Sequence, residues 1–327
     1  MIKLLPDLLK NGDEVRVVAP STGIKIIGAD CRAIAKERFE ALGLKVTFGK
    51  NTTDENFDEF RTSDYQKRAE DIMDAFKDKN VRAIYTIIGG FNSNQVLPFL
   101  DYEIIKANPK VVCGFSDITA LLNGIRAKTG LVTFYGPHYS SIGMKKGNEY
   151  TIDAMQRMLF EGSAEFAPSA EWSDDLWFID QEKREFIKND GWWVLNEGNA
   201  QGVLEGGNIS TLVLLNGTDF AVKFEQPTIL AVENCFISGA DKVEFLRQLQ
   251  AMAQQKNFAQ VKAILIGRFQ KDSQVTKADL EYIVKSIPQL KGLPIIANMD
   301  FGHTTPIATL PLGGKCTIVD GKIKLEW

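Results

Sequence analysis

Residue types that can perform serine hydrolysis occur at widely separated places in this sequence. Such chemistry needs a nucleophile, a base, a group that orients the base, and N–H donors for the oxyanion. Ser116 lies in Gly114-Phe115-Ser116-Asp117, after the apolar run Val111-Val112-Cys113 and before a stretch with helical spacing. A serine at a strand-to-helix turn projects its hydroxyl from the sheet edge, as in a nucleophile elbow. The alternative role for Ser116 is a helix N-cap.

The base and its orienting group have few candidates. The sequence holds two histidines, and any mechanism that needs an imidazole must use one of them. His303 lies in a polar, glycine-bounded loop after an apolar strand, whereas His138 follows Gly136-Pro137. Glu233 ends the apolar run 228–232, where a carboxylate is costly to bury unless it is paired. The alternative for His303 is a purely structural role, and the alternative for Glu233 is a cap on the next segment.

Gly89-Gly90 ends the apolar run 81–88. Two glycines at the carboxyl end of a strand let the backbone approach a ligand and offer exposed N–H groups. In open α/β sheets this edge is where ligands bind. The alternative is a tight turn into a helix. We set a nucleotide cofactor aside because no G-x-G-x-x-G follows the first strand.

The elements that must position these groups alternate between strand and helix, which predicts a parallel sheet in the first half of the chain. We expect strands at 14–21, 44–48, 81–88, 110–113 and 131–135, with helices at 30–42 and 63–77 between them. In the second half we expect strands at 228–232, 261–266 and 293–297, and helices at 241–254 and 277–286. A hairpin around Asp320-Gly321 ends the chain.

A segment of different character separates the two halves. Residues 168–193 contain four of the five tryptophans, Trp172, Trp177, Trp192 and Trp193, without long apolar periodicity. We interpret this segment as a crossing loop or insertion. The expected division is therefore 1–165, a linker or substrate loop at 166–200, and 201–327.

Composition narrows the function classes. The 327 residues carry 38 Lys plus Arg against 42 Asp plus Glu, a net charge of −4. This balance offers no basic footprint for nucleic acid and no polybasic membrane patch. No apolar run is long enough to span a bilayer, so we expect a soluble, cytoplasmic protein. The four scattered cysteines form no C-x-x-C pair, which favours reduced thiols over a disulfide frame or a metal site.

Four short blocks resemble, in order, the signatures of the LD-carboxypeptidase family of serine peptidases, and the resemblance covers nearly the whole chain. The blocks are Ile88-Gly89-Gly90, Gly114-Phe115-Ser116-Asp117, Leu230-Ala231-Val232-Glu233, and Phe301-Gly302-His303-Thr304 with Leu310-Pro311-Leu312-Gly313. The opening residues, from Leu5-Pro6 to Ala19-Pro20-Ser21, also fit this family. Within it, Trp172-Ser173-Asp174-Asp175 and the glycine-rich run to Gly206-Gly207-Asn208 resemble the microcin C immunity branch more than the cell-wall-recycling branch.

The resemblance implies a fold and a set of roles. The fold would be a flavodoxin-like N-terminal domain against a smaller, mixed α/β C-terminal domain, in a homodimer without metal or organic cofactor. Ser116 would be the nucleophile, His303 the general base, and Glu233 the carboxylate that orients His303. The backbone N–H groups of Gly90 and Asp117 would form the oxyanion hole. His138 would then be no more than a pocket wall.

The resemblance also implies two substrate classes. The immunity branch cleaves the amide between an aspartyl residue and a nucleotide-like moiety, and the recycling branch releases a terminal D-amino acid from a murein tetrapeptide. The tryptophans favour the first, because an indole of Trp172 or Trp177 would stack on a purine. Gly89 and Asn208 are the expected further substrate contacts, and packing of the domain junction is the alternative role for the indoles. A non-catalytic α/β ligand-binding protein remains the remote alternative.

Overall fold

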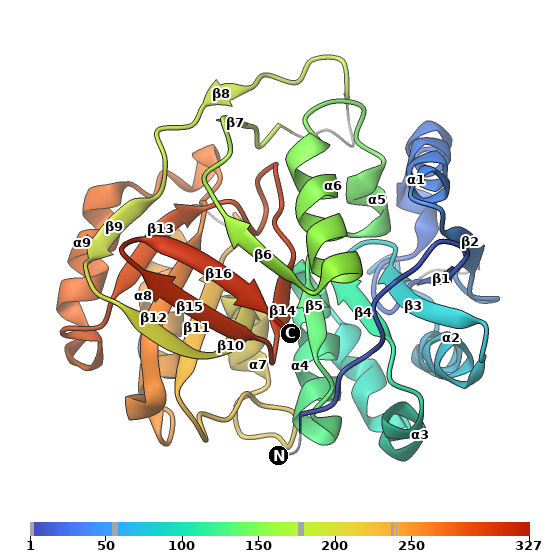
Figure 1. The fold of residues 1–327 in the computed structure, drawn as a ribbon, viewed down its shortest axis with the longest axis horizontal. Helices are drawn as coiled ribbons and strands as arrows, with labels where there is room; N and C mark the ends of the chain where they lie inside the picture. Colours follow the sequence, from blue (N-terminus) through green and yellow to red (C-terminus); the bar gives the residue numbers. More distant parts are fainter. Residues whose placement is uncertain (1–2, 54–57, 176–179, 237–238, 240) are drawn as a thin grey trace.

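The structure is a computed structural model that describes residues 3–53, 58–175, 180–236, 239 and 241–327. Within these residues the chain forms two large sheets that lie side by side. In Figure 1 the blue-to-green half of the chain surrounds one sheet, and the yellow-to-red half surrounds the other. The expected α/β class is confirmed, with a mostly parallel N-terminal sheet and a mixed C-terminal sheet.

The N-terminal sheet has the strand order β14-β5-β4-β3-β1-β2. All its neighbouring strands are parallel except β14, which pairs antiparallel with β5. The strands are β1 (Glu14–Val18), β2 (Lys45–Phe48), β3 (Val81–Thr86), β4 (Val111–Gly114), β5 (Thr133–Tyr135) and β14 (Leu310–Leu312). The inner strands are buried on both faces and are therefore rich in Val and Ile, as parallel strands are.

Helices connect and flank these strands. They are α1 (Ala29–Ala41), α2 (Tyr65–Lys77), α3 (Tyr102–Ala107), α4 (Thr119–Thr129), α5 (Tyr139–Ile142) and α6 (Glu149–Gln156). Asp64 caps α2 by accepting hydrogen bonds from two backbone N–H groups of its first turn. A 3₁₀ turn, Ser93–Phe99, follows Gly89-Gly90, and Pro98 lies within it.

The C-terminal sheet has the order β6-β16-β15-β10-β11-β12-β13-β9. Its strands are β6 (Ser163–Phe166), β9 (Trp193–Asn196), β10 (Ala200–Asn208), β11 (Thr228–Glu233), β12 (Val261–Gly267), β13 (Ile295–Met299), β15 (Lys315–Val319) and β16 (Lys322–Glu326). Its helices are α7 (Ile209–Leu214), α8 (Asp241–Ala253) and α9 (Lys277–Ser286). The four strands β10 to β13 are parallel, so their carboxyl ends meet at one edge.

Each half of the chain contributes a strand to the other half's sheet. β6 lies beside β16 in the C-terminal sheet, and β14 lies beside β5 in the N-terminal sheet (Figure 1). A separate pair, β7 (Glu171–Trp172) and β8 (Ile187–Lys188), lies in the tryptophan-rich segment. The chain therefore passes between the two sheets three times, from β5 to β6, from β13 to β14 and from β14 to β15.

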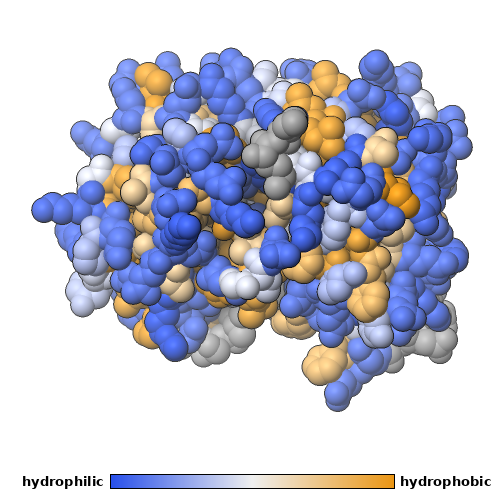
Figure 2. Space-filling model, turned by 90° about the horizontal axis from the view of Figure 1, so that it is seen from below, coloured by the Kyte–Doolittle hydropathy of each residue, from blue (hydrophilic) through white to orange (hydrophobic). Residues whose placement is uncertain are grey.

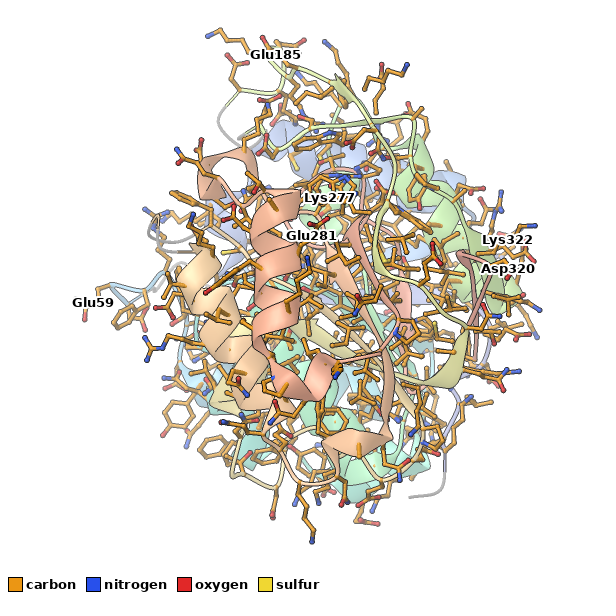
Figure 3. The ribbon with its side chains drawn as sticks, turned by 90° about the vertical axis from the view of Figure 1, so that its left-hand side faces the viewer. Glu59, Glu185, Lys277, Glu281, Asp320 and Lys322 are labelled. Carbon is orange, nitrogen blue, oxygen red and sulfur yellow. The ribbon has the colours of Figure 1, made fainter. Side chains whose placement is uncertain are left out.

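Apolar side chains fill the interior, while hydrophilic side chains cover most of the face seen in Figure 2. Helix α9 illustrates the division: Leu280, Ile283 and Val284 are buried, while Lys277 and Glu281 lie on the side that faces the viewer in Figure 3. Within the described residues, every helix is too short or too polar to cross a bilayer.

Candidate active site

Ser116 lies where the N-terminal sheet faces the C-terminal one. Strand β4 ends at Gly114, and a 3₁₀ turn, Ser116–Ile118, leads directly into α4. The φ of Ser116 is +60°, in the left-handed region, which costs a non-glycine residue about 1–3 kcal/mol and is typical of functional turns. Its hydroxyl forms no cap bond to the helix, so the structure favours the elbow over the N-cap.

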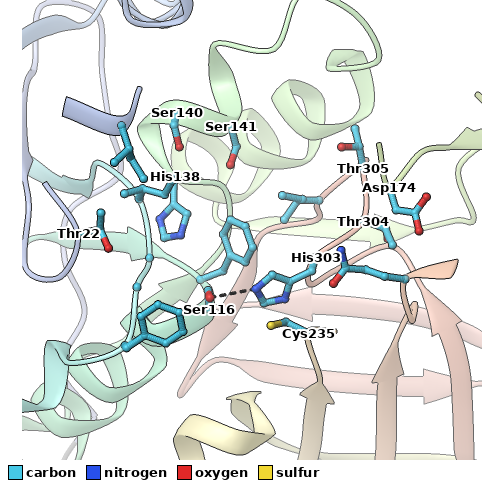
Figure 4. A pocket seen from close by; sticks show the side chains of 18 of the residues that line it. Thr22, Ser116, His138, Ser140, Ser141, Asp174, Cys235, His303, Thr304 and Thr305 are labelled. Carbon is cyan, nitrogen blue, oxygen red and sulfur yellow. Dashed lines mark hydrogen bonds between the residues drawn. The ribbon is translucent and has the colours of Figure 1, made fainter. Parts of the chain in front are cut away.

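His303 and Glu233 reach Ser116 from the other sheet. Glu233 is the last residue of β11, and His303 lies in the loop after β13. His303 Nε2 lies 2.9 Å from Ser116 Oγ, as the dashed line in Figure 4 marks, and His303 Nδ1 lies 2.7 Å from Glu233 Oε2. A carboxylate only accepts, so Nδ1 carries the proton and Nε2 presents its lone pair to the serine hydroxyl.

The Glu233 carboxylate is fully buried and fully hydrogen-bonded. Oε1 accepts from the Tyr135 hydroxyl at 2.6 Å and from Asn208 Nδ2 at 2.9 Å. Burial alone would raise the pKa of Glu233, but its electrostatic interaction with His303 and the hydrogen bonds from His303, Tyr135 and Asn208 outweigh burial and lower the pKa below its usual value. Glu233 is therefore ionised beside His303, and the hydrogen bonds that its carboxylate makes among the described residues go to His303, Tyr135 and Asn208.

Glycine at position 302 makes this close packing possible. Gly302 has φ +104°, and a Cβ there would lie 2.6 Å from Glu233 Oε2. Any side chain would therefore push the carboxylate away from His303.

Gly89 passes directly against the Ser116 hydroxyl, and Gly90 follows it in the wall of the same pocket. A Cβ at Gly89 would lie 3.0 Å from Ser116 Oγ, and Gly90 has φ +153°. The backbone N–H of Asp117 is the second of the helical turn, where N–H groups have no intrahelical acceptor. The Asp117 carboxylate accepts a hydrogen bond from the Ser93 N–H at 2.8 Å, and this bond connects the turn to the segment after Gly90.

A pocket of about 480 Å³ opens over Ser116 (Figure 4). Gly89, Gly90, Ser116 and His303 line it, as does Arg61. Its other lining residues are Thr22, Ile26, Glu59, Phe60, Ile88, Phe91, Phe115, His138, Ser140, Ser141, Met144, Asp174, Asp175, Cys235, Gln270, Thr304, Thr305 and Ile307. The pocket is therefore shared between both halves of the chain, with an apolar wall and few charges.

His138 forms part of that wall. It is 2% exposed, and its Nδ1 lies 2.8 Å from Thr86 Oγ1. Burial, with a smaller contribution from His303, holds its pKa well below the usual value, so His138 is neutral. Phe115 lies between the two imidazoles, with ring centroids 4.3 Å from His138 and 5.2 Å from His303.

The structure places two of the expected substrate contacts elsewhere. Asn208 is 3% exposed, its amide is bonded to Glu233, and its Oδ1 caps α7, so it supports the carboxylate from behind. Trp172 lies in β7 with its ring 5.2 Å from the Arg268 guanidinium, and it lines a neighbouring pocket of about 420 Å³. Gln270 lines both pockets. Trp177 lies outside the described residues.

Several residues that matter to the site were not singled out from the sequence. Tyr135 bonds to Glu233, and a buried ion pair joins Arg268 to Asp300 at 2.9 Å, three residues before His303. Trp192 Nε1 also donates to Asp300, at 3.0 Å, which fits the packing role for this indole. A buried strand-end tyrosine before Gly136-Pro137 is the one sequence signal that could have identified Tyr135.

Metal ligands do not gather in the part of the chain that the structure describes: no three His, Cys, Asp or Glu side chains there could hold an ion. All four cysteines are free thiols.

Known proteins match this chain along nearly its whole length. Residues 15–136 match the LD-carboxypeptidase N-terminal domain, and residues 201–318 match the LD-carboxypeptidase C-terminal domain. The chain belongs to the LD-carboxypeptidase family. Like other members of that family it is a hydrolase. Ser116 lies in the first matched domain, and Glu233 and His303 both lie in the second.

Three members of the family are especially similar. A Bacillus subtilis protein named "Putative carboxypeptidase YocD" is 48% identical over 95% of this chain and 94% of its own length. An MccF-like protein from Bacillus anthracis has a structure with TM-score 0.96 and 45% identity, covering 99% of both chains. The Escherichia coli microcin C7 self-immunity protein MccF is 31% identical over 92% of this chain and 91% of its own.

Two of the similar solved structures show MccF with a bound ligand. They superpose with TM-score 0.87 over 99% of this chain and 98% of theirs, at 28–29% identity. One holds glutamyl sulfamoyl guanosine and another holds aspartyl sulfamoyl adenosine.

Proposed function

We propose that this protein is a serine amidase in which Ser116, His303 and Glu233 act as a catalytic triad. The observation that carries the proposal is the continuous contact from Ser116 Oγ through His303 to Glu233, at 2.9 and 2.7 Å. Both distances lie within hydrogen-bonding range of a nucleophile, a base and its orienting group. The positive φ of Ser116 supports the same role.

The reaction would run in two halves. Ser116 Oγ attacks the substrate carbonyl carbon while His303 Nε2 takes the hydroxyl proton. The carbonyl oxygen gains the negative charge, and the N–H groups of Gly90 and Asp117 stabilise it. As the C–N bond breaks, His303 returns the proton to the leaving nitrogen. Water then attacks the acyl-serine with the same proton relay, which releases the acid and restores Ser116.

The Ser116 N–H is not available for the oxyanion, because it donates to the Tyr135 hydroxyl at 3.2 Å. This commitment supports Gly90 and Asp117 as the two donors. Losing one such donor typically costs about 10²–10³-fold in rate.

We propose an aspartyl or glutamyl group joined by an amide to a nucleotide-like moiety as the substrate. Its acid group would bind Arg61, which has no hydrogen-bond or ion-pair partner for its guanidinium among the described residues. Backbone bonds from Arg61 N–H to Asp58 O and from Gly23 N–H to Arg61 O hold its turn in place. Glu59, also on this turn, points away from the molecule in Figure 3. Likeness to MccF, whose structures hold two acidic aminoacyl sulfamoyl nucleosides, supports this substrate class.

In this proposal Gly89 touches the acyl group, and the nucleoside extends toward Gln270, with Trp172 in the adjoining pocket. The Trp177 indole remains the second candidate for stacking on the base.

The alternative substrate is an L,D-linked murein tetrapeptide, from which a terminal D-amino acid would be released. The family name and the 48% identity to a protein named as a carboxypeptidase favour it. Side-by-side hydrolysis of aspartyl sulfamoyl adenosine and a murein tetrapeptide separates the two. We expect turnover of the adenosine conjugate alone, and release of D-alanine alone would replace our substrate with the alternative.

We further propose a cytoplasmic homodimer. Four free thiols fit a reducing compartment, and the exposed apolar residues Ile26, Phe60 and Phe91 at the pocket rim offer a surface for association. Light scattering should report twice the mass of one chain, and a single-chain mass would refute the dimer.

A further inference from the structure

Four hydrogen bonds close a ring that passes through Tyr135. The Ser116 N–H donates to the Tyr135 hydroxyl oxygen at 3.2 Å, and that hydroxyl lies 2.6 Å from Glu233 Oε1. Glu233 Oε2 accepts from His303 Nδ1 at 2.7 Å, and His303 Nε2 returns to Ser116 Oγ at 2.9 Å. Ser116 is therefore held at two atoms, its side-chain oxygen and its backbone nitrogen.

The direction of each bond follows from the donors available. A backbone N–H only donates, so the Tyr135 oxygen must accept from Ser116. The single hydroxyl hydrogen is then free to point at Glu233, which accepts it. Burial and the neighbouring Glu233 charge hold the pKa of Tyr135 well above its usual value, so the phenol keeps this hydrogen throughout the working pH range.

Tyr135 also spans the junction between the two sheets. It is the last residue of β5, in the N-terminal sheet, whereas Glu233 ends β11 in the C-terminal sheet. Its side chain is fully buried, and its ring packs edge-to-face with Phe115 at 6.3 Å. The hydroxyl cannot leave the ring of bonds without moving the core around it.

We propose that Tyr135 is a positioning residue that couples the geometry of the Ser116 turn to the charge state and orientation of Glu233. This inference rests on the proposed function. On one side the hydroxyl fixes the N–H of a serine whose φ is +60°. On the other side Tyr135 and Asn208 both donate to Oε1, so that among the described residues Oε2 accepts from His303 only.

Two consequences distinguish this role from simple packing. Loss of the hydroxyl removes a hydrogen bond to the Glu233 carboxylate, which makes Glu233 more basic. The acid-side midpoint of the activity profile should therefore move to higher pH. Loss of the anchor on Ser116 N–H should slow attack by Ser116 without weakening substrate binding, so kcat should fall while KM stays within about twofold.

The test uses a fluorophosphonate, because its reaction does not depend on knowing the substrate. Ser116 Oγ attacks phosphorus, fluoride leaves, and His303 takes the hydroxyl proton. Labelling rates are measured from pH 5 to 9 for the wild type, Tyr135→Phe and Tyr139→Phe. Tyr139 is the matched control, since it is also buried and its hydroxyl donates one hydrogen bond, to Arg32 O, away from the site.

We expect Tyr135→Phe to be labelled at least tenfold more slowly, with its acid-side midpoint at higher pH, and Tyr139→Phe to match the wild type. Labelling of Tyr135→Phe at the wild-type rate and with the wild-type midpoint overturns the inference. Wild type that no fluorophosphonate labels would instead refute the proposed serine mechanism itself. Wild type that is labelled but does not hydrolyse the aspartyl conjugate refutes only the proposed substrate.

A second variant avoids any loss of folding. 3-Fluorotyrosine at position 135 keeps the ring and the hydroxyl but makes the phenol a stronger donor. A stronger bond to Glu233 lowers the basicity of the carboxylate, so the acid-side midpoint should move to lower pH, opposite to Tyr135→Phe. A midpoint that does not move with this substitution contradicts the coupling.

Discussion

Gly89 leaves no room for a side chain beside Ser116: a Cβ at position 89 would lie 2.9 Å from Ser116 Cβ and 3.0 Å from Oγ. The backbone that we propose to bind the substrate carbonyl therefore touches the proposed nucleophile itself. Residue 89 and Ser116 can lie this close only because residue 89 has no Cβ.

Gly89→Ala should lower kcat by about 10²-fold, because a displacement of about 1 Å at the reacting atoms costs that much. The φ of Gly89 lies outside the left-handed region, so the backbone should tolerate alanine. Steady-state kinetics beside a thermal melt check this prediction. A variant with unchanged kcat would show that the two segments separate easily.

Arg61→Gln should raise KM for an aspartyl conjugate about five- to tenfold, since a charge-assisted hydrogen bond to a carboxylate contributes roughly 1.5–3 kcal/mol, reduced here by solvent exposure. The kcat should change little. An asparaginyl conjugate of the same nucleoside is the control, and its KM should be the same for both proteins. Equal losses on the two substrates would assign Arg61 a structural role.

Arg268→Ala should lower the free energy of unfolding by about 3–5 kcal/mol, because it leaves the buried Asp300 carboxylate without its cation. Both side chains of this pair are at most 2% exposed. Denaturant titration measures the loss. The exposed pair of Glu103 with Lys106 is the control, and Glu103→Ala should cost less than about 1 kcal/mol. Similar losses for the two variants would contradict the assignment.

Burial raises the pKa of all four thiols, Cys31, Cys113, Cys235 and Cys316, to about 12. The thiolate is the reactive form, and its fraction rises only as pH approaches that value. Iodoacetamide at pH 8 should therefore modify the native protein slowly and all four cysteines after unfolding, as counted by mass spectrometry. Cys235 is the sharpest case because it lines the pocket. Rapid alkylation of Cys235 in the folded protein would contradict the raised pKa of its thiol.

The strand-turn-helix around Ser116 could be predicted from the sequence because it depends on neighbours: an apolar β-branched run, a glycine, and helical spacing after it. Its contacts with Glu233 and His303 could not be derived from spacing, since those residues come from a different sheet. In the sequence, only the positions of Glu233 and His303 near strand ends and the family resemblance indicated that they act together with Ser116.

β10 shows why other features escaped prediction. We expected no strand in its glycine-rich run, yet Gly206 and Gly207 lie in a buried strand. A Cβ at Gly206 would overlap the carbonyl of Ala231, and one at Gly207 would lie 2.7 Å from Thr119. Glycine is present there because neighbouring segments pack too closely for a side chain, which is a property of the tertiary structure alone. The bonds of Tyr135 and Asn208 to Glu233 are long-range in the same way.

The most direct test of the proposed triad is the rate of hydrolysis of aspartyl sulfamoyl adenosine by Ser116→Ala, Glu233→Ala and His303→Ala. Each should reduce kcat/KM by about 10⁴-fold or more, as for the members of other hydrolase triads. His138→Ala is the matched control, because it removes the other imidazole at the pocket, and it should keep most of the activity. Near-wild-type turnover by His303→Ala would contradict the account.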